Sequence, residues 1–288
     1  MTILQTLRSF AQDRLPAPVW EGARLVRQRF ARAIFHPYTA THLFGRRELT
    51  VHINDDVARA WYDGDWKVPA EIEVIATRGQ LRPGATVFDI GAHQAIVAMI
   101  LAEQVGDSGR VVAVEASAHN AVTARANIAT NGVRNVSVVH AAVSDTPGTL
   151  RFTPTLNGHV STGRAPGVEV SAVTVDQLAA EYGLPDVLFL DVEGYEVHVL
   201  RGAAKTIHDA RPDICVEVHS GGMGLEQFGT VDELLALIPG DYTILVAPPD
   251  VEPFVPLADG RTILDRRARL IALAPPDSSR ATFRRNTA

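Results

Sequence analysis

An acid, a glycine and a second acid follow two predicted strands at a spacing that suits a nucleoside. The first strand, residues 86–90, contains Asp89 and is followed by Gly91, and the next strand leads into Glu115. The 24 residues from Gly91 to Glu115 are close to the ~20 expected for one strand–helix–strand step. In such a unit the glycine allows a tight turn beside the ligand, and the acid accepts hydrogen bonds from ribose hydroxyls. The pattern predicts a cofactor that contains adenosine.

The turn after the first strand lacks the glycines that a dinucleotide requires. A dinucleotide-binding turn reads G-x-G-x-x-G, because the pyrophosphate lies against bare backbone at the start of the helix. Here His93 and Ile96 occupy the second and third glycine positions, and a histidine side chain would exclude a pyrophosphate. S-adenosylmethionine carries no phosphate and needs only one tight turn and an acid for its ribose. Gly91 and Glu115 therefore favour S-adenosylmethionine, with an NAD(P)-dependent oxidoreductase as the alternative.

The candidates for binding this cofactor lie at the ends of the first three predicted strands. The third of these strands ends at His140, which we expect to frame the edge of the adenine. The candidate cofactor-binding residues are Asp89, Gly91, Ala92, His93, Glu115, Ala116, His140, Ala141 and Ala142.

Four further ionisable residues follow two later strands. Asp191 and Glu193 come after one of them, and Glu217 and His219 end the next. The carboxyl ends of parallel strands meet at one edge of a sheet, which is where ligands bind in open α/β folds. We therefore expect the four side chains to approach one another, although each alone is also compatible with a helix cap or a surface ion pair.

These residues belong to a longer motif. The run from Val187 to Glu196 reads V-L-F-L-D-V-E-G-Y-E, and V-L-R-G-A follows at 199–203. Together with the earlier turn and the later E-V-H, the motif resembles the FkbM-type methyltransferases over roughly residues 69–245, and D-V-E-G-x-E…L-x-G-A is the specific part of the match. Two positions depart from the family pattern. Ala95 replaces the last glycine of the turn, and Phe189 replaces a lysine, which removes a cation near the site.

The resemblance implies a Rossmann-like class I methyltransferase fold and O-methylation of a hydroxyl on a sugar, an oligosaccharide or a glycosylated metabolite. A neutral hydroxyl is a poor nucleophile, so a base or a metal ion must help to remove its proton. Asp191, Glu193, Glu217 and His219 are the candidate catalytic residues, and a histidine titrates nearest to neutral pH. Alternatively, Asp191 and Glu217 share a Mg²⁺ ion that orients a substrate diol. A non-catalytic scaffold of the same fold is the hypothesis from another class.

Strands and helices alternate regularly from residue 69 onward, which predicts an α/β domain with a mostly parallel sheet covered on both faces. We expect the last strand to be antiparallel and the strands at 149–153 and 168–173 to form an insertion. The other predicted strands are 86–90, 110–114, 136–140, 186–191, 213–218, 242–246 and 268–273, and the predicted helices are 70–78, 94–105, 118–130, 174–182, 195–208 and 231–238.

The domain organisation follows from this alternation. Residues 69–275 form the cofactor-binding domain, and residues 276–288 form a flexible tail. Residues 1–68 are expected to be a helical and irregular extension that caps the substrate or forms a homodimer contact, with 41–66 irregular.

Composition restricts the class of protein. With 46% hydrophobic and 21% charged residues, the chain matches a globular protein with a full core. No secretory signal or run of about 20 apolar residues is evident, and the single cysteine, Cys215, fits a reducing, cytoplasmic compartment. Both ends are basic, but aromatic residues do not interleave with a dense basic stripe, so we expect no nucleic-acid partner.

Overall fold

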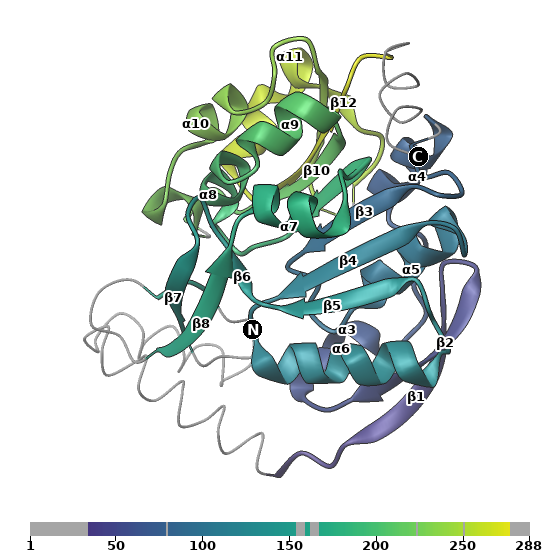
Figure 1. Cartoon of the computed structure of the whole chain (residues 1–288). Coiled ribbons are helices and arrows are strands. Elements are labelled where there is room, and N and C mark those ends of the chain that lie inside the picture. Colours follow the sequence, from purple (N-terminus) through teal and green to yellow (C-terminus); the bar gives the residue numbers. More distant parts are fainter. Residues whose placement is uncertain are drawn as a thin grey trace, which may run out of the picture.

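The computed structural model describes residues 34–78, 80–153, 159–161, 167–222, 224–249 and 251–276. The predictions made for residues 1–33 and for the tail after residue 276 lie outside these ranges. Figure 1 shows a large twisted sheet with helices on both sides. None of the helices in the described ranges is long and apolar enough to cross a membrane.

The central sheet has eight strands and confirms the predicted α/β fold. Five strands run parallel to one another, and the last strand of the chain is antiparallel to both of its neighbours. In order across the sheet the strands are β12 (Val255–Pro256), β11 (Thr243–Ala247), β13 (Ala268–Leu273), β10 (Asp213–Val218), β9 (Val187–Leu190), β3 (Thr86–Ile90), β4 (Arg110–Glu115) and β5 (Val136–His140).

The strand order reverses between β3 and β9. From β3 the chain builds β4 and β5 toward one edge, and it then returns to place β9 and β10 on the other side of β3. Ligands of open α/β sheets bind outside the carboxyl ends of the strands at such a reversal. The residues that follow β3 and β9 are Gly91 and Asp191, so the topology brings the two sequence motifs together at this point.

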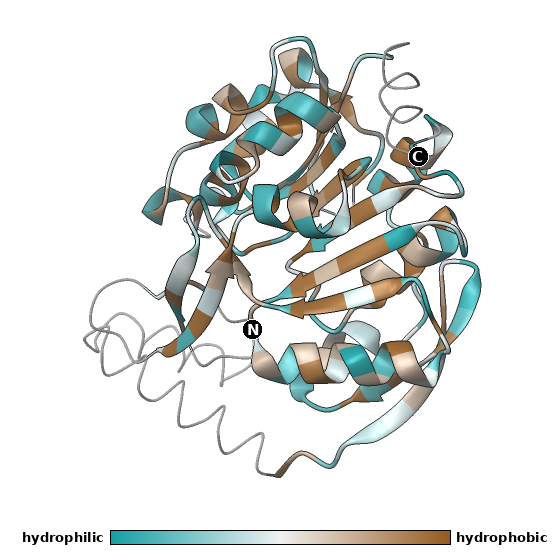
Figure 2. Ribbon diagram, viewed as in Figure 1, coloured by the Kyte–Doolittle hydropathy of each residue, from teal (hydrophilic) through white to brown (hydrophobic). Residues whose placement is uncertain are grey.

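The parallel strands are apolar on both faces, because helices cover each face. Figure 2 shows these strands mostly in the hydrophobic colour, whereas the helices carry hydrophilic outer faces. One core contains Phe88 and Leu188 and packs against α7 (Val175–Tyr182), α8 (Glu196–Arg201), α9 (Ala204–Ala210) and α10 (Val231–Ala236). The other contains Val87 and Val187 and packs against α3 (Asp56–Tyr62), α4 (Ala70–Thr77), α5 (Ile96–Val105) and α6 (Ala118–Thr130).

The interpretation of residues 41–66 as irregular is wrong. They include most of an antiparallel hairpin, β1 (Tyr38–Phe44) and β2 (Arg47–Ile53), followed by α3. Leu49, Val51 and Ile53 are buried in the same core as α5 and α6. Their alternation with polar residues is the period-two signal of a half-buried strand, so the sequence did contain the evidence for β2.

Two other segments bear on the site. The predicted insertion is confirmed as a three-stranded sheet of β6 (Ala142–Val143), β8 (Val168–Val173) and β7 (Gly148–Phe152). The helix predicted over 195–208 is instead divided into α8 and α9 at Gly202. A Cβ atom there would lie 2.0 Å from the carbonyl oxygen of Ser144, so the backbone of the β6 connection packs directly against the break.

Candidate active site

Gly91 joins the two sequence motifs through the backbone. Its φ is +88°, and a Cβ atom built on it would lie 1.7 Å from the carbonyl oxygen of Asp191. The amide of Asp191 donates a hydrogen bond to the carbonyl of Ile90 at 2.9 Å. No larger residue fits here, because the backbone after β9 occupies the space. The glycine is therefore required for the contact between the two turns, in addition to any approach of a ligand.

Glu115 is held at the end of β4 by backbone donors. Its Oε2 accepts the amide of His93 at 2.8 Å, and its Oε1 accepts the amide of Ser117 at 2.6 Å. Burial raises the pKa of this carboxyl to about 7, against the effect of these hydrogen bonds. A carboxylate offers about four lone-pair sites, and the two amides and the side chain of Asn120 occupy three of them. The remaining site suits a hydroxyl of a ribose.

His93 is fixed in a strained turn and remains neutral. Its φ is +48°, and its Nδ1 lies 2.8 Å from the hydroxyl of Tyr62. Burial lowers the pKa of His93 to about 4, so the ring is uncharged at neutral pH. Because the pKa of Tyr62 is raised by burial, the phenol stays protonated and can donate to Nδ1, which leaves the proton of the ring on Nε2. That atom is buried and has no hydrogen-bond partner among the described residues.

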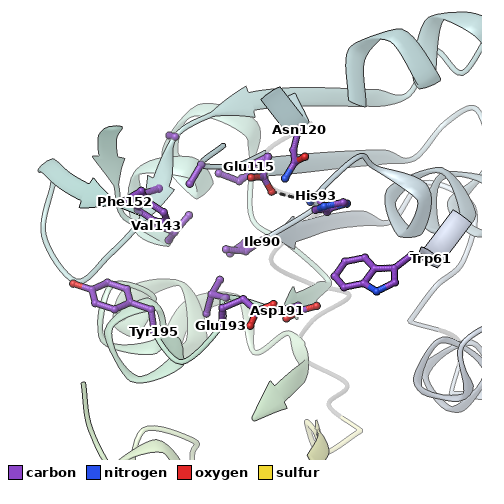
Figure 3. A pocket seen from close by; sticks show the side chains of 16 residues that line it. Trp61, Ile90, His93, Glu115, Asn120, Val143, Phe152, Asp191, Glu193 and Tyr195 are labelled. Carbon is purple, nitrogen blue, oxygen red and sulfur yellow. Dashed lines mark hydrogen bonds between the residues drawn. The ribbon is translucent and has the colours of Figure 1, made fainter. Parts of the chain in front are cut away.

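A pocket opens at the reversal of strand order, and its empty space, the open mouth included, is about 640 Å³. Figure 3 shows Phe152, Val143 and Tyr195 at one end and Trp61 near His93 at the other. Of the nine candidate cofactor residues, six line the pocket: Gly91, His93, Glu115, Ala116, Ala141 and Ala142. Asp89, Ala92 and His140 are not among the lining residues. The ring of His140 is instead exposed and lies with Nε2 3.2 Å from the carbonyl of Ala116.

Several lining residues were not predicted. Asn120 lies in the first turn of α6 and hydrogen-bonds to Glu115, and Phe152 comes from the insertion. Trp61 and the Tyr62–His93 contact come from α3, far away in the sequence. Aromatic clustering around 61–66 was the available signal, but only the packing of α3 against the turn places Trp61 at the pocket. The lining residues outside the prediction are Trp61, Ile90, Val114, Asn120, Val143, Phe152, Val192 and Tyr195.

Asp89 lies beneath the turn at Gly91, and no ion pair of Asp89 is present among the described residues. It is 5% exposed, and its Oδ2 has no hydrogen-bond partner among the described residues. Burial, followed by the charge of Glu115, raises its pKa to about 7. The neighbouring position on β9 is Phe189, where the family pattern has a lysine. The lysine of the family pattern would therefore lie beside Asp89, below the cleft.

The candidate catalytic residues do come together. His219 is 1% exposed, and its Nε2 lies 3.6 Å from Asp191 Oδ1 and 3.6 Å from Glu193 Oε2. Its Nδ1 lies 2.7 Å from Oε1 of Glu196, which is fully buried. Burial alone would lower the pKa of His219, but the hydrogen bond to Glu196 and the nearby acids outweigh it and raise the pKa to about 9. Glu196 was quoted in the motif without a role, and the structure gives it one.

Asp191 and Glu217 face the same point from adjacent strands. Ligand atoms of Asp191, Glu217 and His219 all lie within 4.8 Å of one another, and Glu217 also pairs with Arg267. Burial and the charge of Glu217 raise the pKa of Asp191 well above its usual range. Because 48% of the Asp191 side chain is exposed in the open cleft, solvent moderates this shift until a ligand covers it.

The loop that carries Glu193 is held by close backbone packing. Glu193 has a φ of +52°, a left-handed conformation that is unusual for a residue with a side chain. A Cβ atom on the next residue, Gly194, would lie 2.6 Å from the backbone of Gly224. This packing fixes Glu193, which lines the pocket next to Asp191.

The model of the FkbM methyltransferase domain matches residues 89–241, which is slightly more than half of the chain. The match begins at Asp89 and includes both turns of the site. No protein of curated function matches the sequence significantly.

Solved methyltransferase structures are similar to this chain at low sequence identity. Methyltransferase FkbM from Methylobacillus flagellatus is 16% identical, with a TM-score of 0.44 over 66% of this chain and 43% of that one. An S-adenosylmethionine-dependent O-methyltransferase from Thermotoga maritima is 17% identical, with a TM-score of 0.41 over 73% and 67%. Aeropyrum pernix fibrillarin with bound S-adenosylmethionine is 12% identical, with a TM-score of 0.41 over 70% and 74%. The chain spans less than half the length of the first of these proteins.

Proposed function

Since the chain belongs to the FkbM methyltransferase family, we propose that it transfers a methyl group from S-adenosylmethionine to a hydroxyl oxygen of a sugar, an oligosaccharide or a glycosylated metabolite. The observation that carries the proposal is the division of one pocket into two parts. One part offers the hydroxyl acceptor Glu115 and small apolar residues, and the other offers Asp191 and Glu193.

The residues of the first part fit the cofactor. Glu115 retains a lone pair for a ribose hydroxyl beside the donors His93, Ser117 and Asn120. Ala116, Ala141 and Ala142 leave room for a flat adenine ring. The neutral His93 has a buried Nε2 with no partner among the described residues, and this atom is available to the methionyl end. When bound, S-adenosylmethionine supplies a methyl group already activated by its sulfonium.

The chain's own task is then to position the acceptor and take its proton. The acceptor oxygen forms a bond to the methyl carbon while the carbon–sulfur bond breaks, and the bonding electrons remain on sulfur. The hydroxyl proton passes to a base. Positioning is expected to account for much of the acceleration, because the methyl donor is already reactive.

The structure favours a carboxylate as that base. His219 has a pKa of about 9 and is therefore protonated at neutral pH in the ligand-free protein. Asp191 and Glu193 are the acids of the cluster that line the pocket, so we assign proton acceptance to one of them. His219 lies beneath both and balances their charge.

A Mg²⁺ ion between Asp191 and Glu217 is the second way to activate the hydroxyl, because their oxygens face one point. A hard dication prefers such oxygen ligands. Full activity of enzyme treated with EDTA, without added cation, would exclude this form of the proposal.

Calorimetry with S-adenosylhomocysteine tests the proposed function. We expect one site per chain and at least ~10-fold weaker binding in Glu115→Gln, since each charged hydrogen bond contributes roughly 1.5–3 kcal/mol. Glu103→Gln, an exposed change on α5, is the matched control. Absence of binding, or unchanged binding in Glu115→Gln, would refute the assignment.

The alternatives give different results in the same assay. An oxidoreductase would show saturable binding of NAD(P) in place of S-adenosylhomocysteine. A scaffold would keep its biological role in Asp191→Asn, a change that leaves the cofactor part of the pocket intact.

The acceptor is best sought with glycans. Trp61 is 41% exposed at the pocket and offers an aromatic face on which a sugar ring could stack. The N-terminal extension, residues 1–68, and the segments 154–168 and 247–256 are the proposed specificity elements. Light scattering of the full chain measures its molar mass and so tests the predicted homodimer.

A further inference from the structure

The buried imidazole of His219 has one nitrogen engaged and one without a partner. Nδ1 lies 2.7 Å from Glu196 Oε1, and the two side chains are 1% and 0% exposed. Nε2 is also buried but has no hydrogen-bond partner among the described residues. A polar atom buried without a partner is costly, and here it points toward the acids of the cleft. Glu196 therefore fixes the ring of His219, and Nε2 faces any ligand that is bound by Asp191 and Glu193.

The distances around Nε2 do not match direct hydrogen bonds. Asp191 Oδ1 and Glu193 Oε2 each lie 3.6 Å away, which is beyond hydrogen-bond range. Two atoms that share one dication at about 2.1 Å each are about 3.0–3.5 Å apart. The spacing of Asp191 and His219 is thus close to that of two ligands of one ion.

A third ligand comes from Glu217. One ligand atom from each of Asp191, Glu217 and His219 lies within 4.8 Å of the others, a spread that one ion can bridge after small side-chain movements. The three residues lie at or just after the ends of the adjacent strands β9 and β10, whose backbones pair up to Leu190 and Val216. Arg267 pairs with Glu217. A dication bound to Nε2 would replace the positive charge that the protonated His219 provides in the ligand-free protein.

We propose that Asp191, Glu217 and His219 form a site for one first-row transition-metal dication, with Glu196 orienting the imidazole. An imidazole nitrogen with two carboxylates suits Mn²⁺, Fe²⁺ or Zn²⁺ better than Mg²⁺, which prefers oxygen ligands only. The carboxylate–histidine contact is the usual second layer of such a site, and it fixes both the tautomer and the ring.

This site deepens the proposed function and rests on it for its role. With Asp191 engaged as a ligand, Glu193 is the remaining acid of the cluster that lines the pocket. The acceptor hydroxyl would bind the ion, which lowers the pKa of the hydroxyl, and Glu193 would take its proton.

Titration of the full-length protein with Mn²⁺ alone tests the site. We expect one ion per chain by calorimetry and a ¹⁴N coupling to the bound Mn²⁺ in pulsed electron paramagnetic resonance. Asp191→Asn and Glu217→Gln should each weaken binding by at least ~10-fold. Glu196→Gln should weaken it by ~10–100-fold, as the loss of an orienting partner does. His219→Gln should remove the nitrogen coupling.

The control is Asp209→Asn, since Asp209 forms an exposed acid–imidazole pair with His208 at 2.8 Å and should not matter. The proposal is overturned if the unmodified protein does not bind one Mn²⁺ ion per chain, or if its bound Mn²⁺ shows no nitrogen coupling. This holds whatever the variants do. Binding of S-adenosylhomocysteine is measured in parallel. If the protein binds S-adenosylhomocysteine but not Mn²⁺, only the metal site is refuted. If it binds Mn²⁺ but not S-adenosylhomocysteine, only the methyltransferase assignment is refuted.

Discussion

The carboxylates at the two ends of the cleft differ in the charged groups around them. At the cofactor end, Asp89 and Glu115 are buried, and burial raises both pKa values to about 7. At the reaction end, Asp191, Glu193 and Glu217 face a protonated imidazole or an arginine. The first environment suits acceptance of hydrogen bonds from neutral hydroxyls, whereas the second suits charge and proton transfer. Under the proposed function, one kind of side chain would serve two roles because its surroundings differ.

The largest expected effect comes from breaking the contact that joins the two ends. In Gly91→Ala the new methyl group would meet the carbonyl of Asp191 at 1.7 Å, at a φ of +88°. We expect a loss on the order of 4 kcal/mol or more in the free energy of unfolding, together with loss of S-adenosylhomocysteine binding. Chemical denaturation measures the first quantity and calorimetry the second.

Gly132→Ala is the matched control for this substitution. Its φ is +62°, but nothing lies within 4 Å of the added Cβ, so only the backbone strain of about 1 kcal/mol should appear. Equal losses in the two variants would show that the collision with Asp191 is not what makes Gly91 necessary.

The reaction end should be separable from the cofactor end by Glu193→Gln. This change removes the proposed base but no ligand of the cofactor. We expect kcat for methyl transfer to fall by about 10²–10⁴-fold, with S-adenosylhomocysteine binding within about twofold of the unmodified protein. Glu115→Gln should show the opposite pattern. If Glu193→Gln instead weakens cofactor binding and spares kcat, the two ends have been assigned the wrong way round.

The buried acid of the cofactor end should make stability depend on pH. The folded protein keeps the Glu115 proton up to about pH 7, against the ordinary value of 4.5. Its contribution is therefore fully present below about pH 4.5 and is lost as the pH rises to 7, by about 3 kcal/mol. Denaturation across this range should show a smaller decrease in Glu115→Gln. The exposed Glu103→Gln change should retain the full decrease, and equal slopes in all three proteins would contradict the assignment.

The smallest effect is expected at Ala95, which has a φ of +65° and is fully buried. Ala95→Gly relieves left-handed strain of about 1–2 kcal/mol and loses a buried methyl group of about 0.8 kcal/mol. The free energy of unfolding should rise by no more than about 1 kcal/mol, and S-adenosylhomocysteine binding should stay within about twofold.

Ala121→Gly provides the comparison for Ala95, because Ala121 is equally buried but lies within α6. There the change should destabilise the protein by about 1 kcal/mol or more. If both variants lose the same free energy in thermal and chemical denaturation, the turn at Ala95 is not under strain.

Much of the fold could be predicted, because the periodicity of apolar residues and the positions of turn-forming residues are local properties of the sequence. The strands from Thr86 onward are apolar runs bounded by turn residues, and the Asn131-Gly132 pair ends α6 as expected. The hairpin before residue 54 was missed although Leu49, Val51 and Ile53 alternate in the pattern of a strand. The break at Gly202 has no local signal, since it depends on the approach of the Ser144 carbonyl.

By itself, the sequence determined the fold class and the residues at the strand ends, since both follow from residue type and spacing, and its motifs carried the resemblance to the family. Only the tertiary structure decided which contacts surround each of those residues. Long-range packing placed α3 beside the turn, so that Tyr62 holds His93, and it set Phe189 next to Asp89. It also buried Glu196 under His219, which directs Nε2 toward the acids of the cleft. Such contacts depend on burial and distance across the strand reversal, and no run of neighbouring residues encodes them.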